Sequence, residues 1–242
     1  MERATHHRHG GGPRAMLLVA LTTAPVPAAT QTFGGDCERR KPDVTLVWYD
    51  VFGLFGGSHE PAAAELRGVL CRIGVSADSR LAAPGSAYAA DGAVEVAVML
   101  LRSFGGDAAE PERVMGVVPA GLPPGVPRPV RVYLAGIETA LGRSLWAEPS
   151  PDAILGRAVG RVVAHELFHA LAPWEPHADS GLMQASLARD ALVGPVPEVD
   201  ATHARALHGV LLRRGAGPSR TLWAGADVDH VLTAGPAPAA AF

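Results

Sequence analysis

Residues 151–183 form the stretch PDAILGRAVGRVVAHELFHALAPWEPHADSGLM, and its first part has the pattern of a helix. Apolar residues recur there at helical spacing, after Ser150 as an N-cap residue, Pro151 at the first helical position and Asp152 in the first turn. Pro173 cannot continue a helix. The stretch therefore predicts a long, mostly apolar helix that ends shortly before Pro173, and such a helix is expected to be buried.

His165 and His169 lie near the end of this helix, four residues apart. Residues at this spacing share one helix face, so the two rings can present nitrogen atoms to a single metal ion. Glu166 lies one position round from the first histidine, where its carboxylate can reach a water held by that metal. Three protein ligands leave a fourth position open, which is typical of a catalytic zinc ion. The pattern predicts one catalytic Zn²⁺.

The third ligand must come from beyond the helix. His177 is the predicted ligand, because neutral imidazole suits zinc. Glu175 and Asp179 are alternatives, since carboxylates also bind zinc. Glu198 or Asp200, on a later helix, is the weakest alternative. The residues alone leave this choice open.

The pattern HExxHxxxxxxxHxxxGhM, in which h is an apolar residue, resembles the motif of the metzincin clan of zinc metallopeptidases. In the usual motif, HExxHxxGxxH, a glycine stands where this chain has Ala172 and a histidine stands where it has Glu175. His177 comes two residues late. The turn from Gly181 to Met183 falls at the separation from the first histidine that matrix-metalloprotease-like members show. The variant is also similar to a group of uncharacterised secreted bacterial proteins.

The resemblance covers residues 129–193 best, and it implies both a fold and an activity. The implied fold is α+β (α/β-like), with a mixed twisted sheet packed against helices and a long active-site helix that bears HExxH. The implied activity is that of a secreted zinc metalloendopeptidase, in which Glu166 is the general base that activates water for attack on a peptide bond. Met183 would lie in the Met-turn beneath the metal, or it is simply a core methionine that fills a gap.

Two other hypotheses stay open. A zinc amidase acting on cell-wall peptides would use the same site chemistry. A secreted zinc-binding domain of metzincin-like fold without efficient catalysis is favoured by Ala172 in place of glycine and by the late His177. The presence of Glu166 argues against this last hypothesis, since a purely structural metal site needs no carboxylate beside its ligand.

Charge and hydropathy limit the partners of the chain. The 242 residues carry a formal net charge of −3 and show no basic cluster, so nucleic acid is not an expected partner. The expected partner is a protein or peptide substrate. Outside the N-terminus no apolar segment is long enough to cross a bilayer, so no membrane span is expected in the mature chain. No pattern indicates an oligomeric state.

The N-terminus resembles an export signal. Three arginines within the first 14 residues precede a short apolar run at 16–24, and small residues at 27–29 suit a cleavage site. The expected location is secreted or periplasmic. Cys37 and Cys71 form one even pair, which in an exported protein is most simply a disulfide. The predicted organisation is a signal peptide at 1–29, a metallopeptidase-like catalytic domain at 30–214 and a disordered Gly/Pro/Ala-rich tail at 215–242.

The rest of the chain predicts strands and helices around the metal helix. His203 and His208, on the last predicted helix, are interpreted as ordinary surface or packing histidines, and Tyr133 as a strand residue. The strand at 114–118 is the predicted edge along which an extended substrate pairs. Strands are predicted at 44–52, 75–81, 94–101, 114–118 and 131–134, helices at 58–73, 137–145 and 200–213, and a proline-rich loop at 121–129.

Overall fold

The computed structural model describes residues 37–82, 93–106, 110–120 and 128–215. All of them belong to one compact unit, Thr32–Phe242. The predicted signal peptide, the tail that follows residue 215 and most of the proline-rich loop lie outside the described residues. The predicted domain boundaries therefore stay predictions.

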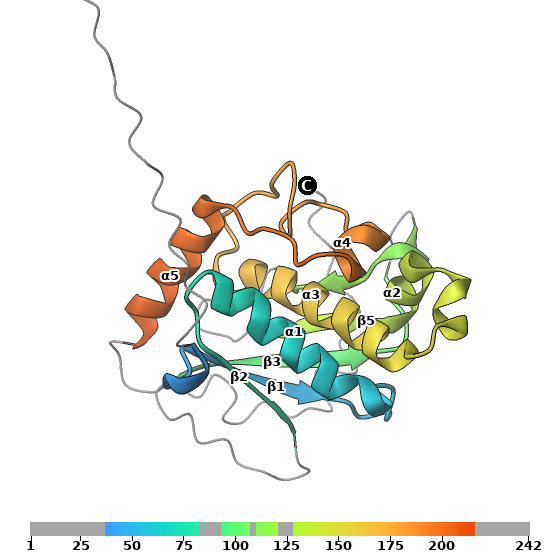
Figure 1. Ribbon diagram of the computed structural model, residues 1–242. Helices are drawn as coiled ribbons and strands as arrows, with labels where there is room; N and C mark the ends of the chain where they lie inside the picture. The colour runs from blue at the N-terminus through green and yellow to red at the C-terminus, as the bar shows by residue number, and fades with distance from the viewer. Residues whose placement is uncertain (1–36, 83–92, 107–109, 121–127, 216–242) are drawn as a thin grey trace, which may run out of the picture. The chain divides into compact units, whose positions relative to one another are not determined.

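A five-stranded sheet lies at the centre of the unit (Figure 1), and its strand order is β2-β1-β3-β5-β4. The first four strands in this order run parallel, while β4 pairs antiparallel with β5 and forms one edge. The strands are β1 (Val44–Tyr49), β2 (Ala77–Leu81), β3 (Val94–Leu101), β4 (Gly116–Val117) and β5 (Val130–Tyr133). The predicted mixed sheet packed against helices is confirmed, and most of its pairings are parallel.

Two long helices lie side by side over one face of the sheet (Figure 1): α1 (His59–Arg72) and α3 (Pro151–Leu171). Alternate residues of β1, among them Leu46 and Trp48, point into the core beneath these helices. Gly160 of α3 lets the helices approach closely, because a Cβ atom there would lie 3.0 Å from the Cβ of Glu65 and closer still to a backbone carbonyl of α1. The long predicted helix is thus confirmed, and most of it is buried.

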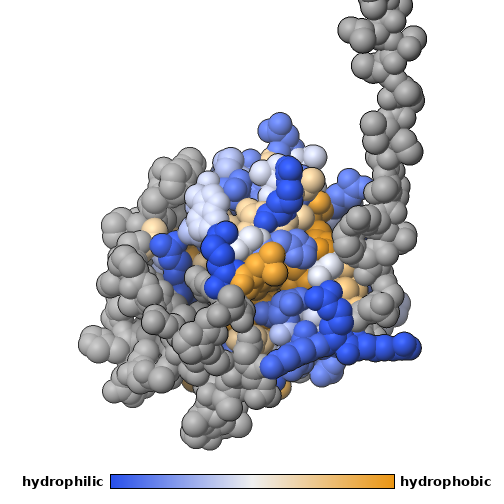
Figure 2. All heavy atoms as spheres, turned by 90° about the vertical axis from the view of Figure 1, so that its left-hand side faces the viewer, coloured by the Kyte–Doolittle hydropathy of each residue, from blue (hydrophilic) through white to orange (hydrophobic). Residues whose placement is uncertain are grey.

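The described residues form three further α-helices: α2 (Leu134–Leu141), α4 (Arg189–Val193) and α5 (Ala201–Gly215). His208 of α5 hydrogen-bonds through Nε2 to the Ile73 carbonyl, at the end of α1, at 2.5 Å. Figure 2 shows the face that carries α5, where apolar side chains gather in the middle and hydrophilic ones border them. Helix α5 contributes Leu207 and Val210 to the core and exposes Leu212.

The N-terminal end of the described chain is joined to α1 by its cysteines. Cys37 lies in a short 3-10 helix (Cys37–Arg39), and Cys71 lies in the last turn of α1. Their sulfur atoms are at disulfide-bonding distance, with Cα atoms 5.6 Å apart, so the predicted pair is confirmed. No described helix combines the length and the apolar character that a membrane span requires.

Several element boundaries differ from the predictions. The strand predicted at 44–52 ends at Tyr49, because the Asp50 carboxylate accepts hydrogen bonds from the backbone N–H groups of Leu54 and Phe55 and so turns the chain. Ser150 precedes α3, as expected, but its side chain makes no capping hydrogen bond. The strand predicted at 114–118 shortens to two residues, the helix predicted at 137–145 begins earlier and ends at Leu141, and α4 was not predicted.

Candidate metal centre

Three histidine rings converge at the end of α3. The Nε2 atoms of His165 and His169 lie 3.0 Å apart, and those of His169 and His177 lie 3.1 Å apart. Within the described parts of the chain, these three residues form the one group of His, Cys, Asp or Glu side chains placed to hold a metal ion, with ligand atoms all within 4.8 Å of one another. The alternative carboxylates, Glu175 and Asp179 among them, are not part of this group.

The spacing of these nitrogen atoms fits a tetrahedral metal site. A metal–nitrogen bond of about 2.0–2.1 Å places two tetrahedral ligand atoms about 3.3 Å apart. The two observed separations, 3.0 and 3.1 Å, are close to this value. Three ring nitrogens this close together need a cation or a proton among them, since their lone pairs otherwise repel. The donor set therefore suits a metal ion held by three imidazoles.

The ring of His165 is held in the tautomer that binds a metal through Nε2. Its Nδ1–H donates a hydrogen bond to the carbonyl of Leu182, at 2.8 Å. With the proton on Nδ1, the lone pair of Nε2 points toward His169 and His177. Such a bond to the outer nitrogen orients a metal-binding histidine and fixes its tautomer.

The rings are also kept neutral. Burial lowers the pKa of His165 to about 4, and the neighbouring rings of His177 and His203 act in the same direction. Burial, followed by the charges of the nearby histidines, lowers the pKa of His169 to about 3. The pKa of His177 is also lowered, and burial is the largest cause. Neutral imidazole is the form that binds metal, so near pH 7 protons do not compete for these nitrogens.

The segment after α3 brings His177 close to His165 and His169. Helix α3 ends at Leu171, and the N–H of Ala178 then donates to the carbonyl of Met183 at 2.8 Å. Gly181 in the turn between them has φ = +78°, which favours glycine. Met183 is 1% exposed and belongs to the hydrophobic core. It is therefore a packing residue, as both interpretations of this methionine require.

Glu166 lies beside the histidines and against the edge strand. It is 8% exposed, and burial raises the pKa of its carboxyl to about 8. A Cβ atom at Gly116 of β4 would lie 2.6 Å from the Glu166 Oε1 atom, so the absence of a side chain at 116 leaves room for the carboxylate. Tyr133 is a buried residue at the end of β5, as predicted, and burial raises the pKa of its phenol.

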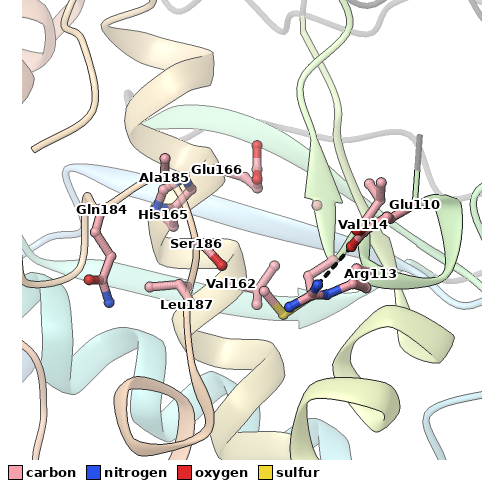
Figure 3. A pocket seen from close by; sticks show the side chains of 12 residues that line it. Glu110, Arg113, Val114, Val162, His165, Glu166, Gln184, Ala185, Ser186 and Leu187 are labelled. Atoms are coloured by element: carbon pink, nitrogen blue, oxygen red, sulfur yellow. Dashed lines mark hydrogen bonds and ion pairs between the residues drawn. The ribbon is translucent and has the colours of Figure 1, made fainter. Parts of the chain in front are cut away.

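A cavity of about 360 Å³ adjoins His165 and Glu166. Figure 3 shows its walls, with residues of α3 between the chain around β4 and the segment 184–187. Arg113 lies at the β4 side and forms an ion pair with Glu110 at 2.7 Å. The other lining residues are Val114, Met115, Gly116, Val162, Gln184, Ala185, Ser186 and Leu187. Segments far apart in the sequence thus meet next to the histidine group.

The interpretation of His203 as an ordinary packing histidine omits its polar contacts. His203 is 4% exposed, its Nδ1 bonds to a carboxylate oxygen of Asp200, and its Nε2 lies 2.8 Å from the carbonyl oxygen of Pro176. The Asp-x-x-His spacing at the start of a predicted helix was a signal for the first contact. The second contact joins residues 27 apart, and local spacing carries no sign of it.

Arg161 is a second buried polar residue that the sequence analysis missed. It lies one helical turn before His165 and is 1% exposed. Its guanidinium binds the carboxylate of Glu65 at 2.7 Å and three backbone carbonyls of residues 191–195. Arg161 thereby joins α3 to α1, to α4 and to the chain that follows α4. An arginine on the apolar face of the predicted helix was a signal that a buried partner exists.

Comparison of the chain with protein-family models, with curated proteins and with solved structures finds no match.

Proposed function

We propose that His165, His169 and His177 hold one zinc ion and that the chain is a metzincin-like zinc metallopeptidase. The observation that carries this proposal is the convergence of three Nε2 atoms beside a buried carboxylate, Glu166, at the wall of a cavity. Three nitrogen ligands with one open position are the typical protein contribution to a catalytic zinc site. The cysteine pair is compatible with export, and we propose that the chain is exported.

Bound zinc would supply a Lewis acid that lowers the pKa of a water molecule and polarises the substrate carbonyl. Glu166 accepts the proton of that water on a carboxylate oxygen while the water oxygen attacks the carbonyl carbon. Glu166 then passes the proton to the nitrogen of the leaving amine. Burial raises the pKa of Glu166, which makes its ionised carboxylate a stronger base, and a zinc ion beside it would favour the ionised form that accepts the proton.

The substrate is proposed to bind as an extended strand along β4. This strand is the edge of the sheet, and its first residue, Gly116, lies against Glu166. An added strand would therefore run past the general base, with main-chain hydrogen bonds supplying affinity. The cavity beside it has apolar walls at Met115, Val162 and Leu187, which suit an apolar substrate side chain.

A second candidate is a zinc-binding domain without efficient turnover. The observation that favours it is the near-complete burial of Glu166, which is 8% exposed and packed against Gly116, because a general base has to reach water. A zinc amidase acting on cell-wall peptides would use the same residues and differs only in substrate.

The test compares the mature chain with its Glu166→Gln variant, in zinc content and in hydrolysis of casein and of a peptide library. We expect one zinc per chain in both proteins and hydrolysis by the unaltered chain alone. Zinc in both without hydrolysis of any protein or peptide would favour the binding domain. Hydrolysis of cell-wall peptides alone would favour the amidase. The absence of zinc from both proteins would refute the metal site.

A further inference from the structure

We propose that His203 is a positioning residue that holds the loop of His177 in its metal-binding place. The proposal rests on the proposed function, in which His177 is the third ligand of the metal. His203 lies in the first turn of α5, and it reaches the loop through the carbonyl of Pro176, the residue directly before His177. It does not belong to the group that could hold a metal.

The loop of His177 needs such a contact because it has little burial of its own. His177 is exposed, and Trp174 in the same loop is 58% exposed. Two hydrogen bonds hold the backbone on either side of the ligand: the Pro176 carbonyl accepts from His203, and the Ala178 N–H donates to Met183. Proline has no N–H, so the carbonyl is the one backbone group at 176 that can form a hydrogen bond.

The two partners of the His203 ring are both acceptors. The Pro176 carbonyl has no hydrogen to donate. Burial alone would raise the pKa of Asp200, but hydrogen bonds from the His203 backbone and ring and from the Thr202 N–H lower the pKa of this carboxyl overall, so Asp200 is ionised. Both ring nitrogens of His203 thus face acceptor oxygens, so the ring is engaged on both sides and is not free to bind a metal. A hydrogen bond to an ionised carboxylate is stronger than a neutral one, so the contact between Asp200 and the buried His203 ring suits a fixed support.

The His203 side chain is itself held by two neighbours, Asp200 and Phe168. Asp200 caps α5, since its Oδ1 accepts from the N–H groups of Thr202 and His203 at 2.9 and 3.2 Å. The ring of His203 also packs edge to face with Phe168 of α3, with centroids 6.2 Å apart. Phe168 directly precedes His169 in α3. His203 thus holds the loop ligand relative to the helix that carries the other two ligands.

Helix α5 offers a matched control. His208 also donates through Nε2 to a backbone carbonyl, that of Ile73, but this carbonyl lies at the end of α1. Loss of the His208 bond would loosen α5 without touching the loop of His177. Two amide replacements of His203 separate its two contacts. In His203→Gln the amide nitrogen takes the place of Nε2 and can still reach the Pro176 carbonyl. In His203→Asn the side chain is shorter and can reach Asp200 alone.

The experiment uses the mature chain and measures two quantities for the unaltered protein, His203→Asn, His203→Gln and His208→Asn, in which the shorter side chain cannot reach the Ile73 carbonyl. The first is the zinc dissociation constant, by competition with a chromophoric chelator. The second is hydrogen exchange of the backbone amides at 174–179 in EDTA-treated protein. We expect His203→Asn to raise the dissociation constant by about 10- to 100-fold, as loss of a residue that supports a metal ligand does, and to speed exchange at 174–179. We expect a smaller effect for His203→Gln and none for His208→Asn.

Unchanged zinc binding and unchanged exchange in His203→Asn would overturn the proposal, and so would an equal loss in His208→Asn. If His203→Asn does not fold, Asp200→Asn takes its place, because asparagine keeps the helix cap but removes the charge that the ring faces. A several-fold weaker zinc affinity is then expected, and an unchanged affinity would refute the support. If the unaltered chain binds no zinc, the proposed function fails, while the exchange measurement still decides whether His203 holds the loop.

Discussion

At the scale of single residues, the edge strand β4 limits the position of the Glu166 side chain. Gly116 lies so close to this side chain that a Cβ atom would be 2.6 Å from its Cγ and Oε1 atoms. The carboxylate can keep its place only while residue 116 has no side chain. The position of the proposed general base therefore depends on a residue in another element, about fifty positions earlier in the chain.

Replacement of Gly116 by alanine is expected to leave zinc binding intact and to lower turnover. The added methyl group would displace the Glu166 carboxylate, and a shift of about 1 Å in a catalytic group costs about 100-fold in rate. The measurement is peptide hydrolysis together with zinc content. Gly105→Ala is the control, because a Cβ at Gly105 meets nothing within 4 Å. Turnover equal to that of the control would show that Glu166 is not constrained by the strand.

The lowered pKa values of His165 and His169 make the stability of the metal-free protein depend on pH. Folding lowers these pKa values from 6.5 to about 4 and about 3. Between pH 6.5 and about 4 the unfolded chain therefore binds more protons than the folded chain, so the free energy of unfolding falls as the pH falls. Above pH 6.5 this contribution to stability is fully present.

Because the raised pKa of Glu166 acts in the opposite direction over this range, the check is urea unfolding of EDTA-treated protein in which Glu166 is replaced by Gln, at pH 7.5 and pH 5, with and without the His169→Gln change. We expect a lower midpoint at pH 5, and a smaller difference between the two midpoints in the His169→Gln variant, which lacks one of the two titrating rings. The same difference in both proteins would mean that other groups, such as ion-paired carboxylates, cause the pH dependence.

Sequence reasoning works well for residues whose partners lie close in the chain. His165 and His169 lie one helical turn apart, and His177 follows within the same segment, so helix geometry and ligand chemistry were enough to predict the group. His203 was interpreted as a packing residue because its decisive partner, the carbonyl of Pro176, comes from a loop 27 residues earlier. No periodicity records a contact of that kind.

At the scale of elements, close contact between α1 and α3 supports the proposed metal site. Helix α3 carries two of its three proposed ligands, and Gly156 and Gly160 bring its backbone against α1. The ion pair of Arg161 with Glu65 lies in the same contact. Small residues at a helix contact allow a short distance between axes and leave little space for any added atom.

The same substitution is expected to have opposite effects in these two helices. In Gly160→Ala the new methyl group would collide with the Ala62 carbonyl and crowd Glu65, and overpacking of this kind costs about 1–3 kcal/mol of stability. In Gly68→Ala of α1 the methyl group meets nothing within 4 Å. Since alanine is the better helix former, that variant should gain up to about 1 kcal/mol. Urea unfolding measures both, and a stabilised Gly160→Ala variant would contradict the close contact.

Elements were predicted best where a pattern is long. The apolar run of β3 and the periodic α3 appeared within two residues of their predicted bounds, whereas the strand at 114–118 shortened to Gly116–Val117. Short elements such as β4 and α4 owe their place to partners elsewhere: β4 pairs with β5, and the carbonyls that follow α4 bind Arg161. Local propensity carries little information about such elements.

At the scale of the whole molecule, the cavity beside the histidines is built from distant segments. Its walls come from residues 110–116, from α3 and from residues 184–187. The antiparallel position of β4 at the sheet edge brings the first of these segments to the helix. The sequence indicated which strands exist and which helix carries the ligands. The order β2-β1-β3-β5-β4 depends on long-range pairing, which no single segment specifies.

The cysteine pair is expected to stabilise the whole described unit, because it ties the chain at Cys37 to α1. A cross-link between residues separated by 34 positions contributes about 3–4 kcal/mol in the chain-entropy model. The measurement is urea unfolding with and without dithiothreitol. The Cys37→Ala, Cys71→Ala double variant should unfold at a lower urea concentration, with no response to the reductant. An unaltered chain that also shows no response would contradict the disulfide.

The most direct test of the proposed metal site is X-ray absorption at the zinc edge, on the purified protein loaded with one equivalent of zinc. Three histidines and one open position predict three imidazole nitrogens and one oxygen at about 2.0–2.1 Å, with no sulfur. The His177→Ala variant should lose one imidazole contribution, which would identify the third ligand. A spectrum with sulfur ligands, with six oxygen neighbours, or with no change in the His177→Ala variant would contradict the three-histidine site.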